Sequence, residues 1–150
     1  MAKFRYRMQS ILNIKLKMEE QAKMQFAQAQ AKLNEEEEKK LQRLKERKSL
    51  YESDLKEQLQ SKLNLLKIEE LQNAVIRMEE FITLQKREVD KAARVVEKER
   101  QKLTEVMMER KSHEKLKENA FEEFMQELNS AEGKEIDELT SYTYGQKNKN

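Results

Sequence analysis

The catalytic chemistry open to this 150-residue chain is limited by its residue types. There is one histidine, His113, and no cysteine, so disulfides, thiolate catalysis and zinc–thiolate sites are excluded. His113 follows Glu109 by four residues, a spacing that places the two side chains on one helix face and could contribute to a metal site. A helical di-metal centre, however, needs several inward carboxylates and paired histidines. Glycine-rich phosphate loops and nucleophile elbows are also absent. We therefore expect no catalytic residue, no metal and no cofactor, and predict that the chain is not an enzyme.

The start of the chain combines apolar and basic side chains. Residues 3–18 hold five basic residues and no acid, and residues 4–18 include six apolar aliphatic and two aromatic side chains. Such a stretch can face an acidic protein partner, or it can lie on a membrane surface as a basic amphipathic helix. A nucleic-acid site is disfavoured because only these five charges support it, and the net charge of the whole chain is +2.

The overall composition favours long helices. The chain has no proline and two glycines, and 40% of its residues are charged against 37% that are apolar. Proline and glycine are the residues that break helices, so their scarcity predicts uninterrupted helical segments. No apolar run approaches the ~18 residues that a membrane span requires.

The second half of the chain carries a heptad repeat. Steps of four and three residues from Leu71 to Phe124 define sixteen positions, of which eleven are apolar. This pattern is typical of a coiled coil. We call these positions, and those that face them from the first half, the heptad seam. In the first half the expected seam positions are Phe4, Met8, Ile11, Lys15, Met18, Ala22, Phe26, Ala29, Leu33, Leu41, Leu44, Lys48, Tyr51 and Leu55. Phase shifts near residue 22 and between Leu33 and Leu41 are stutters, which need not end a helix.

The two halves are expected to form an all-α antiparallel coiled-coil hairpin within a single domain, residues 1–150. Ser61 and Asn64 are candidate helix caps near the middle. We predict helix one at about 4–60, a turn at about 58–68, helix two at about 66–130 and a flexible tail at about 133–150. A turn near residue 63 pairs residue i with a residue near 127 − i.

This pairing makes specific predictions. Phe4 should contact Phe121 and Phe124. Leu44 and Tyr51 should lie beside Met78 and Phe81. The acidic run Glu35–Glu38 should form ion pairs with four basic residues of the other helix, Lys86, Arg87, Lys91 and Arg94.

Two parts of the sequence resemble a known family. The opening Phe4-Arg-Tyr6-Arg-Met8-Gln9-Ser10-Ile11-Leu12 is similar to the N-terminal pattern of the FliJ family, the coiled-coil component of the bacterial flagellar type III export apparatus. The segments 114–118 and 132–139 are similar in general character to the C-terminal half of that family's sequences.

The resemblance implies a two-helix stalk, similar to the central shaft of rotary ATPases. It also implies cytoplasmic partners at the inner face of the cell membrane: the hexameric export ATPase, the export gate protein FlhA and export chaperones. The expected ATPase contacts are Phe4, Arg5, Arg7, Phe121 and Phe124, and the expected gate contacts are Leu44, Tyr51, Met78 and Phe81. The alternatives are a structural tether or peripheral stalk of another machine, and a membrane-surface binder.

Overall fold

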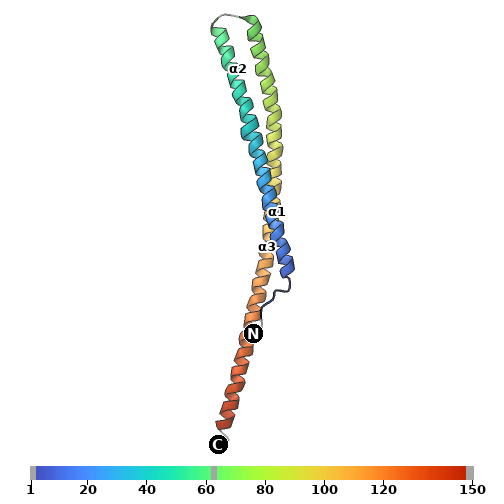
Figure 1. Cartoon of the computed structure of the whole chain (residues 1–150), viewed down its shortest axis with the longest axis vertical. Coiled ribbons are helices and arrows are strands. Elements are labelled where there is room, and N and C mark those ends of the chain that lie inside the picture. The colour runs from blue at the N-terminus through green and yellow to red at the C-terminus, as the bar shows by residue number, and fades with distance from the viewer. Residues whose placement is uncertain (1–2, 62–63, 148–150) are drawn as a thin grey trace. The chain divides into compact units, whose positions relative to one another are not determined.

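The structure, a computed structural model, describes residues 3–61 and 64–147, and within these residues it contains helices and no strand. Helix α1 spans Gln9–Asn34, a π-helix η1 spans Glu35–Leu41, and helix α2 spans Gln42–Gln60. The long helix α3 spans Leu65–Lys147. Figure 1 shows α2 returning beside the first part of α3, so the predicted all-α antiparallel hairpin is confirmed.

The chain reverses between Gln60 and Leu65. The Ser61 hydroxyl donates a hydrogen bond to the carbonyl of Glu57, which satisfies one of the last carbonyl groups of α2. The Asn64 side-chain oxygen accepts a hydrogen bond from the backbone N–H of Lys67 at 3.4 Å, as expected of a residue that caps the start of α3. The reversal falls inside the predicted turn, whose centre at residues 62 and 63 lies outside the described residues.

The chain divides into two compact units. The turn unit is Glu20–Thr104, and the terminal unit combines Met1–Glu19 with Glu105–Asn150. Each is described by itself below. In the turn unit, Lys48 pairs with Glu79 across the two helices, which obeys the 127 − i rule. In the terminal unit, the Lys15–Glu109 pair deviates from the rule by three residues.

The heptad seam of α3 is confirmed. All sixteen positions predicted between Leu71 and Phe124 are buried or half-buried, including the polar residues Gln85, Glu99 and Arg110. The buried apolar side chains of α3 are Ile68, Met78, Ile82 and Ala92. Burial of such side chains is the main stabilising term for a two-helix fold.

The seam predicted for the start of helix one is wrong by one residue. Leu12 is buried with 3% of its surface exposed, whereas Ile11 is 38% exposed. Met8 and Met18 are exposed as well, and the buried residue beside Met18 is Glu19. The sequence pattern misled here because a carboxylate, rather than an apolar side chain, occupies the seam position. From Leu12 the seam continues through Lys15, Glu19, Ala22, Phe26, Ala29, Leu33 and Glu36, with no stutter near residue 22.

The second predicted phase shift is real, and a π-helix accounts for it. The next buried residue after Glu36 is Leu41, five residues later, where a regular heptad would place it at residue 40. A π-helix closes i to i+5 hydrogen bonds and therefore accommodates one additional residue. Leu41 and the following seam positions thus return to the inner face without a break in the helix.

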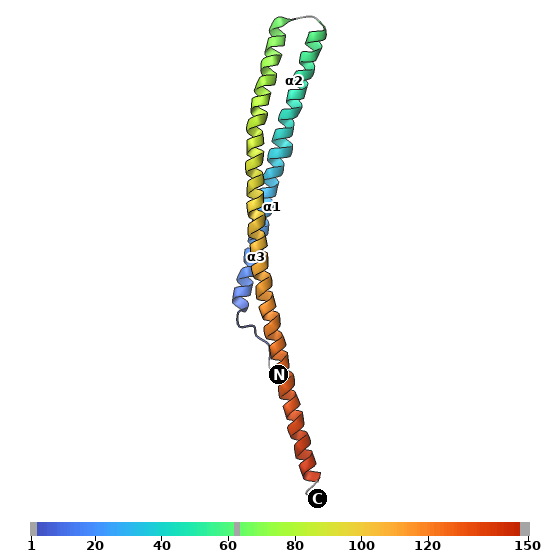
Figure 2. The ribbon, with the colours of Figure 1, turned by 180° about the vertical axis from the view of Figure 1, so that it is seen from behind.

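The helix ends differ from those expected. Residues 3–6 have no regular structure, residues 7 and 8 form a turn, and α1 begins at Gln9, whose N–H donates to the Tyr6 carbonyl at 3.1 Å. Figure 2 shows this segment running alongside α3 before α1 starts. At the other end, α3 continues to Lys147, so helix two extends beyond residue 130. Gly133 does not end the helix, because it lacks a positive φ and its neighbours are good helix formers.

Among the described residues, none of the helices combines the length and apolar content of a membrane span.

Candidate partner-binding surfaces

The terminal unit holds the predicted aromatic cluster. The ring of Phe4 lies 5.2 Å from that of Phe121 in an edge-on arrangement with an interplanar angle of 77°, and 5.5 Å from that of Phe124. Both distances are in the range of favourable aromatic pairs. Phe4 and Phe124 are half-buried and Phe121 is exposed. The predicted approach of these three residues is therefore confirmed, and it anchors the N-terminal segment to α3.

Exposure alternates along residues 3–7 and separates aromatic from basic side chains. Phe4 and Tyr6 are half-buried, whereas Arg5 and Arg7 are exposed and form no ion pair within the described residues. The segment borders a shallow hollow whose other side is formed by Leu116, Ala120, Glu123, Phe124 and Glu127. This places two free cations beside an apolar surface.

Polar residues link the two helices of the terminal unit. The Arg110 guanidinium donates to both carboxylate oxygens of Glu19, with Nε–Oε2 at 2.5 Å, and its Nη1 donates to Glu114 at 2.8 Å. The hydrogen bond with Glu19 raises the pKa of Arg110 further above its usual range. Lys15 donates to Glu109 at 2.8 Å and lowers the pKa of that carboxyl.

His113, the candidate metal ligand, lies half-buried in the seam of the terminal unit, and its Nδ1 has no hydrogen-bond partner in the part of the chain that the structure describes. That part contains no group of three or more residues able to hold a metal ion. The arrangement is that of a packed seam residue.

The turn unit brings together two of the four residues predicted to contact a gate protein. Leu44 and Phe81 line one hollow together with Leu84 and Gln85. Phe81 is 49% exposed, and Tyr51 is half-buried. Met78 is only 8% exposed and belongs to the core between the helices. The exposed apolar side chains that line this hollow are therefore Phe81 and Leu84.

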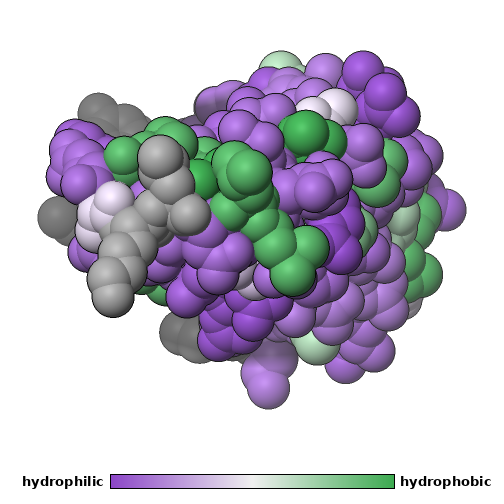
Figure 3. Space-filling model, turned by 90° about the horizontal axis from the view of Figure 1, so that it is seen from above, coloured by the Kyte–Doolittle hydropathy of each residue, from purple (hydrophilic) through white to green (hydrophobic). Residues whose placement is uncertain are grey.

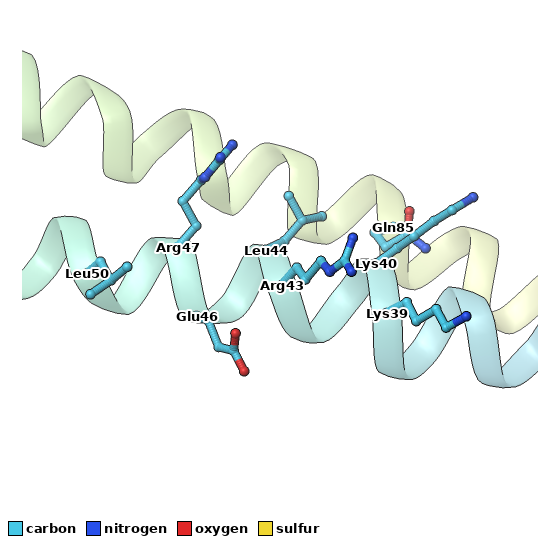
Figure 4. A pocket seen from close by; sticks show the side chains of 8 residues that line it. All are labelled: Lys39, Lys40, Arg43, Leu44, Glu46, Arg47, Leu50 and Gln85. Carbon is cyan, nitrogen blue, oxygen red and sulfur yellow. The ribbon is translucent and has the colours of Figure 1, made fainter.

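A basic groove on α2 was not singled out from the sequence. It is lined by Lys39, Lys40, Arg43, Leu44, Glu46, Arg47, Leu50 and Gln85. Figure 4 shows Leu44 directed toward α3 and Glu46 directed away from it. Arg43 and Arg47 have no ion pair within the described residues. The recurrence of basic residues around three leucines in KKLQRLKERKSL is the signal that could have revealed this groove.

The acidic run Glu35–Glu38 does not form the predicted ion pairs with the basic residues of α3 in the described structure. Instead, Glu36 is buried, and its carboxylate accepts hydrogen bonds from Gln85 at 2.5 Å and from Lys40 at 2.9 Å. These bonds lower the pKa of Glu36, with Gln85 making the larger contribution. The prediction failed because the run winds around the π-helix, so that only one of its four side chains faces α3.

Exposed leucines also flank the turn. Leu59 at the end of α2 and Leu65 and Leu66 at the start of α3 are exposed. In the view of Figure 3, hydrophobic patches interrupt a mostly hydrophilic surface. A two-helix hairpin has little interior, so part of its apolar surface remains open to water or to a partner.

The comparisons with curated proteins and with solved structures gave no match. The model of one protein family, described as flagellar FliJ protein, matches residues 4–149. This match covers almost the whole chain and agrees with the aromatic-basic opening and the helical hairpin. The chain therefore belongs to the FliJ family of flagellar proteins.

Proposed function

We propose that this chain is a stalk or adaptor that links the flagellar export ATPase to the export gate protein FlhA and to export chaperones. Membership of the FliJ family makes it a flagellar export-related coiled-coil protein, and that family is a non-catalytic component of the export system. The proposal adds these three partners. It assigns one surface of the chain to the ATPase and another to the gate protein. It places the protein in the cytoplasm, at the inner face of the membrane through these partners.

The observation that carries the proposal is the position of Arg5 and Arg7. Both are exposed beside the contact of Phe4 with Phe121 and Phe124, so the aromatic cluster holds at a fixed place two cations that form no ion pair in the described part of the chain. Such a surface suits a pore or ring lined with carboxylates, because opposite charges accelerate association and orient the partners. The apolar rings add burial at the same place.

The gate contact is assigned to the turn unit. Phe81 and Leu84 are exposed and border one hollow with Leu44, an arrangement that suits apolar docking. Tyr51 is half-buried and can contribute an edge to this contact. Met78 is excluded from the contact surface because it is buried in the core.

The test compares two double variants in pull-down experiments with the ATPase and with the gate protein. Arg5→Glu with Arg7→Glu should lose ATPase binding and keep gate binding. Phe81→Ala with Leu84→Ala should lose gate binding and keep ATPase binding. A matched control, Lys98→Glu with Lys111→Glu, makes the same change in net charge at two exposed positions and should keep both.

Salt provides a second criterion. ATPase binding should weaken as ionic strength rises, because exposed charges are screened. Gate binding should depend much less on salt, because it rests on apolar burial. If both variants lose the same partner while circular dichroism shows that they remain helical, the two-surface assignment is wrong and a structural tether becomes the better function.

A further inference from the structure

The last part of α3 presents an apolar stripe that the described residues leave uncovered beyond Phe121, which Phe4 contacts. Positions 121, 125, 128, 136 and 139 follow a spacing of three, four or eight residues and therefore share one helix face. They are occupied by Phe121, Met125, Leu128, Ile136 and Leu139. Apart from the half-buried Leu128, these side chains are between 37% and 66% exposed. We call this part of the helix, residues 121–142, the acidic stripe, because it also holds seven acidic residues, which are distributed around the helix, and one basic residue, Lys134.

The described N-terminal segment covers only the start of this stripe. Phe4 contacts Phe121 and Phe124, so the segment that begins at Lys3 lies opposite residues up to about 124. Beyond that point, residues 129–132 and 134–143 are all exposed. Within the described residues, none of the seven carboxylates of the stripe takes part in an ion pair. Beyond Glu127, both its apolar surface and its charge are thus left without a partner from the described part of the same chain.

Residues 3–18 have the complementary character. Ile11, Ile14 and Met18 are exposed there, along the edge of α1 that the seam leaves free. This segment carries five basic residues and no acid. Of these five, Lys3, Arg5, Arg7 and Lys17 are exposed and have no ion pair among the described residues. The segment and the acidic stripe are therefore opposite in charge and alike in exposing aliphatic side chains.

We propose that two copies of this chain associate through their terminal units, with residues 3–18 of each copy packed on the acidic stripe of the other. Because each copy offers both surfaces, the contact is reciprocal and closes as a two-fold dimer. Apolar burial along the stripe supplies the binding free energy, and the charges select the pairing and its direction.

The register of this dimer follows from the pairing within one chain together with a two-fold axis placed so that residues 3–18 meet the acidic stripe. Residue i of α1 lies opposite a residue near 127 − i of its own α3, as the Phe4 contacts and the Lys15–Glu109 pair show to within three residues. With a two-fold axis near residues 124 and 125, the two α3 helices run antiparallel. Residues 3–18 of one copy then lie beside residues 125–140 of the other. Ile14 of one copy meets Ile136 of the other, and Lys17 approaches Glu138.

A cysteine pair tests this register directly, because the chain has no cysteine of its own. Within one chain Ile14 lies near residue 113, so residue 136 is about 35 Å away along α3 at 1.5 Å per residue. A disulfide needs Cα atoms within about 7 Å. The full-length variant Ile14→Cys with Ile136→Cys should therefore form a covalent dimer under mild oxidation. Each single-cysteine variant is the matched control and should remain largely uncrosslinked.

A charge exchange tests the pairing without a crosslink. Lys3→Glu with Lys17→Glu, and separately Glu127→Lys with Glu138→Lys, should each raise the dissociation constant of self-association at least about tenfold at low salt. An equimolar mixture of the two variants should recover association, because each then offers the charge that the other lacks. Lys86→Glu with Lys98→Glu changes the net charge equally at exposed positions of the turn unit and should have no effect.

The oligomeric state is measured by sedimentation equilibrium on the full chain, with helix content checked by circular dichroism. A chain that stays monomeric at all concentrations, a double-cysteine variant that does not crosslink, or a mixture that fails to associate overturns the proposal. Monomers that instead bind vesicles of anionic phospholipid through residues 3–18 would assign the basic segment to a membrane surface. The dimer covers Arg5 and Arg7, the cations assigned above to the ATPase, so it is an alternative to the ATPase complex. These readouts involve neither the ATPase nor the gate protein, so failure of the dimer can be distinguished from failure of the proposed function.

Discussion

The Gln85 carboxamide of α3 donates two hydrogen bonds to Glu36 of the π-helix, one to its carboxylate at 2.5 Å and one to its backbone carbonyl at 3.1 Å. One side chain thus satisfies both the buried charge and a carbonyl at the place where the helix takes in an additional residue. Buried polar groups are costly unless they are hydrogen-bonded. The contact explains how a seam interrupted by a five-residue step can remain packed.

The π-helix can be tested by removing its additional residue. Deletion of Lys39, which is exposed, places the present Leu41 four residues after Glu36 and restores a regular heptad. The variant should keep its helix content, and its thermal midpoint by circular dichroism should lie within about 3 °C of the parent, since the seam stays aligned.

A deletion inside regular helix is the matched control. Removing Arg94, also exposed, rotates Val96, Leu103 and all later seam positions of α3 by about 100°. This deletion should lower the thermal midpoint by at least about 8 °C, because several core side chains lose their burial. Similar losses in the two deletion variants would contradict the assignment of Lys39 to an inserted position.

The pH dependence of stability should reveal the Glu36–Gln85 contact. Hydrogen bonds from Gln85 and Lys40 hold the pKa of Glu36 below its ordinary value of 4.5 in the folded chain. The ionised carboxylate therefore stabilises the fold fully above about pH 4.5, and this contribution disappears as pH falls through the lower folded pKa. Replacement of Gln85 by Leu removes the largest cause of this lowering of the Glu36 pKa.

The stability of Gln85→Leu relative to the parent should consequently rise as pH falls from 7 to 3. Urea unfolding at several pH values measures this difference, in which the titration of the other carboxylates largely cancels. A difference that stays constant with pH would show that Gln85 does not affect the ionisation of Glu36.

The phase of α1 gives a prediction about two adjacent residues. Leu12 is buried and Ile11 is exposed, although the apolar pattern alone favoured Ile11 for the seam. Leu12→Ala should cost about 2–4 kcal/mol of unfolding free energy, because it leaves a cavity in the core. Ile11→Ala should cost less than about 1 kcal/mol. Urea unfolding at a protein concentration too low for self-association gives both values, and equal costs would argue against the observed phase.

The sequence predicted α3 better than the first half of the hairpin for a physical reason. Eleven of the sixteen α3 seam positions are apolar, so hydrophobic periodicity alone identified the buried face. In the first half, Lys15, Glu19 and Glu36 occupy seam positions, and their burial depends on hydrogen bonds with the other helix. Those bonds become visible only when both helices are in place.

The candidate surfaces were likewise predictable in part. The Phe4 contacts followed from antiparallel pairing, which brings aromatic residues that are far apart in the sequence together. The burial of Met78 followed from its place in the heptad seam, although Met78 was also expected to contact the gate protein. The exposure of Ile14 and Met18 depends on which face of α1 is buried. Apolar residues alone did not identify that face, because Glu19 occupies one of its seam positions.

The Glu19–Arg110 pair should contribute more than the neighbouring Lys15–Glu109 pair. Glu19 is only 6% exposed, and Arg110 bonds both of its oxygens, whereas Glu109 is largely open to water. Removing one member of a buried ion pair is strongly destabilising because a charge stays buried, while replacing both members by apolar residues is often neutral. Exposed pairs contribute little.

Arg110→Leu should therefore lower the thermal midpoint clearly, and the double variant Glu19→Leu with Arg110→Leu should recover most of the loss. Arg110→Lys should be intermediate, because an ammonium group keeps the charge but cannot bond both oxygens in the same planar arrangement. A double-mutant cycle on Lys15 and Glu109 is the control and should give a smaller coupling. If the two cycles give equal couplings, the buried pair contributes no more to the terminal unit than a surface contact does.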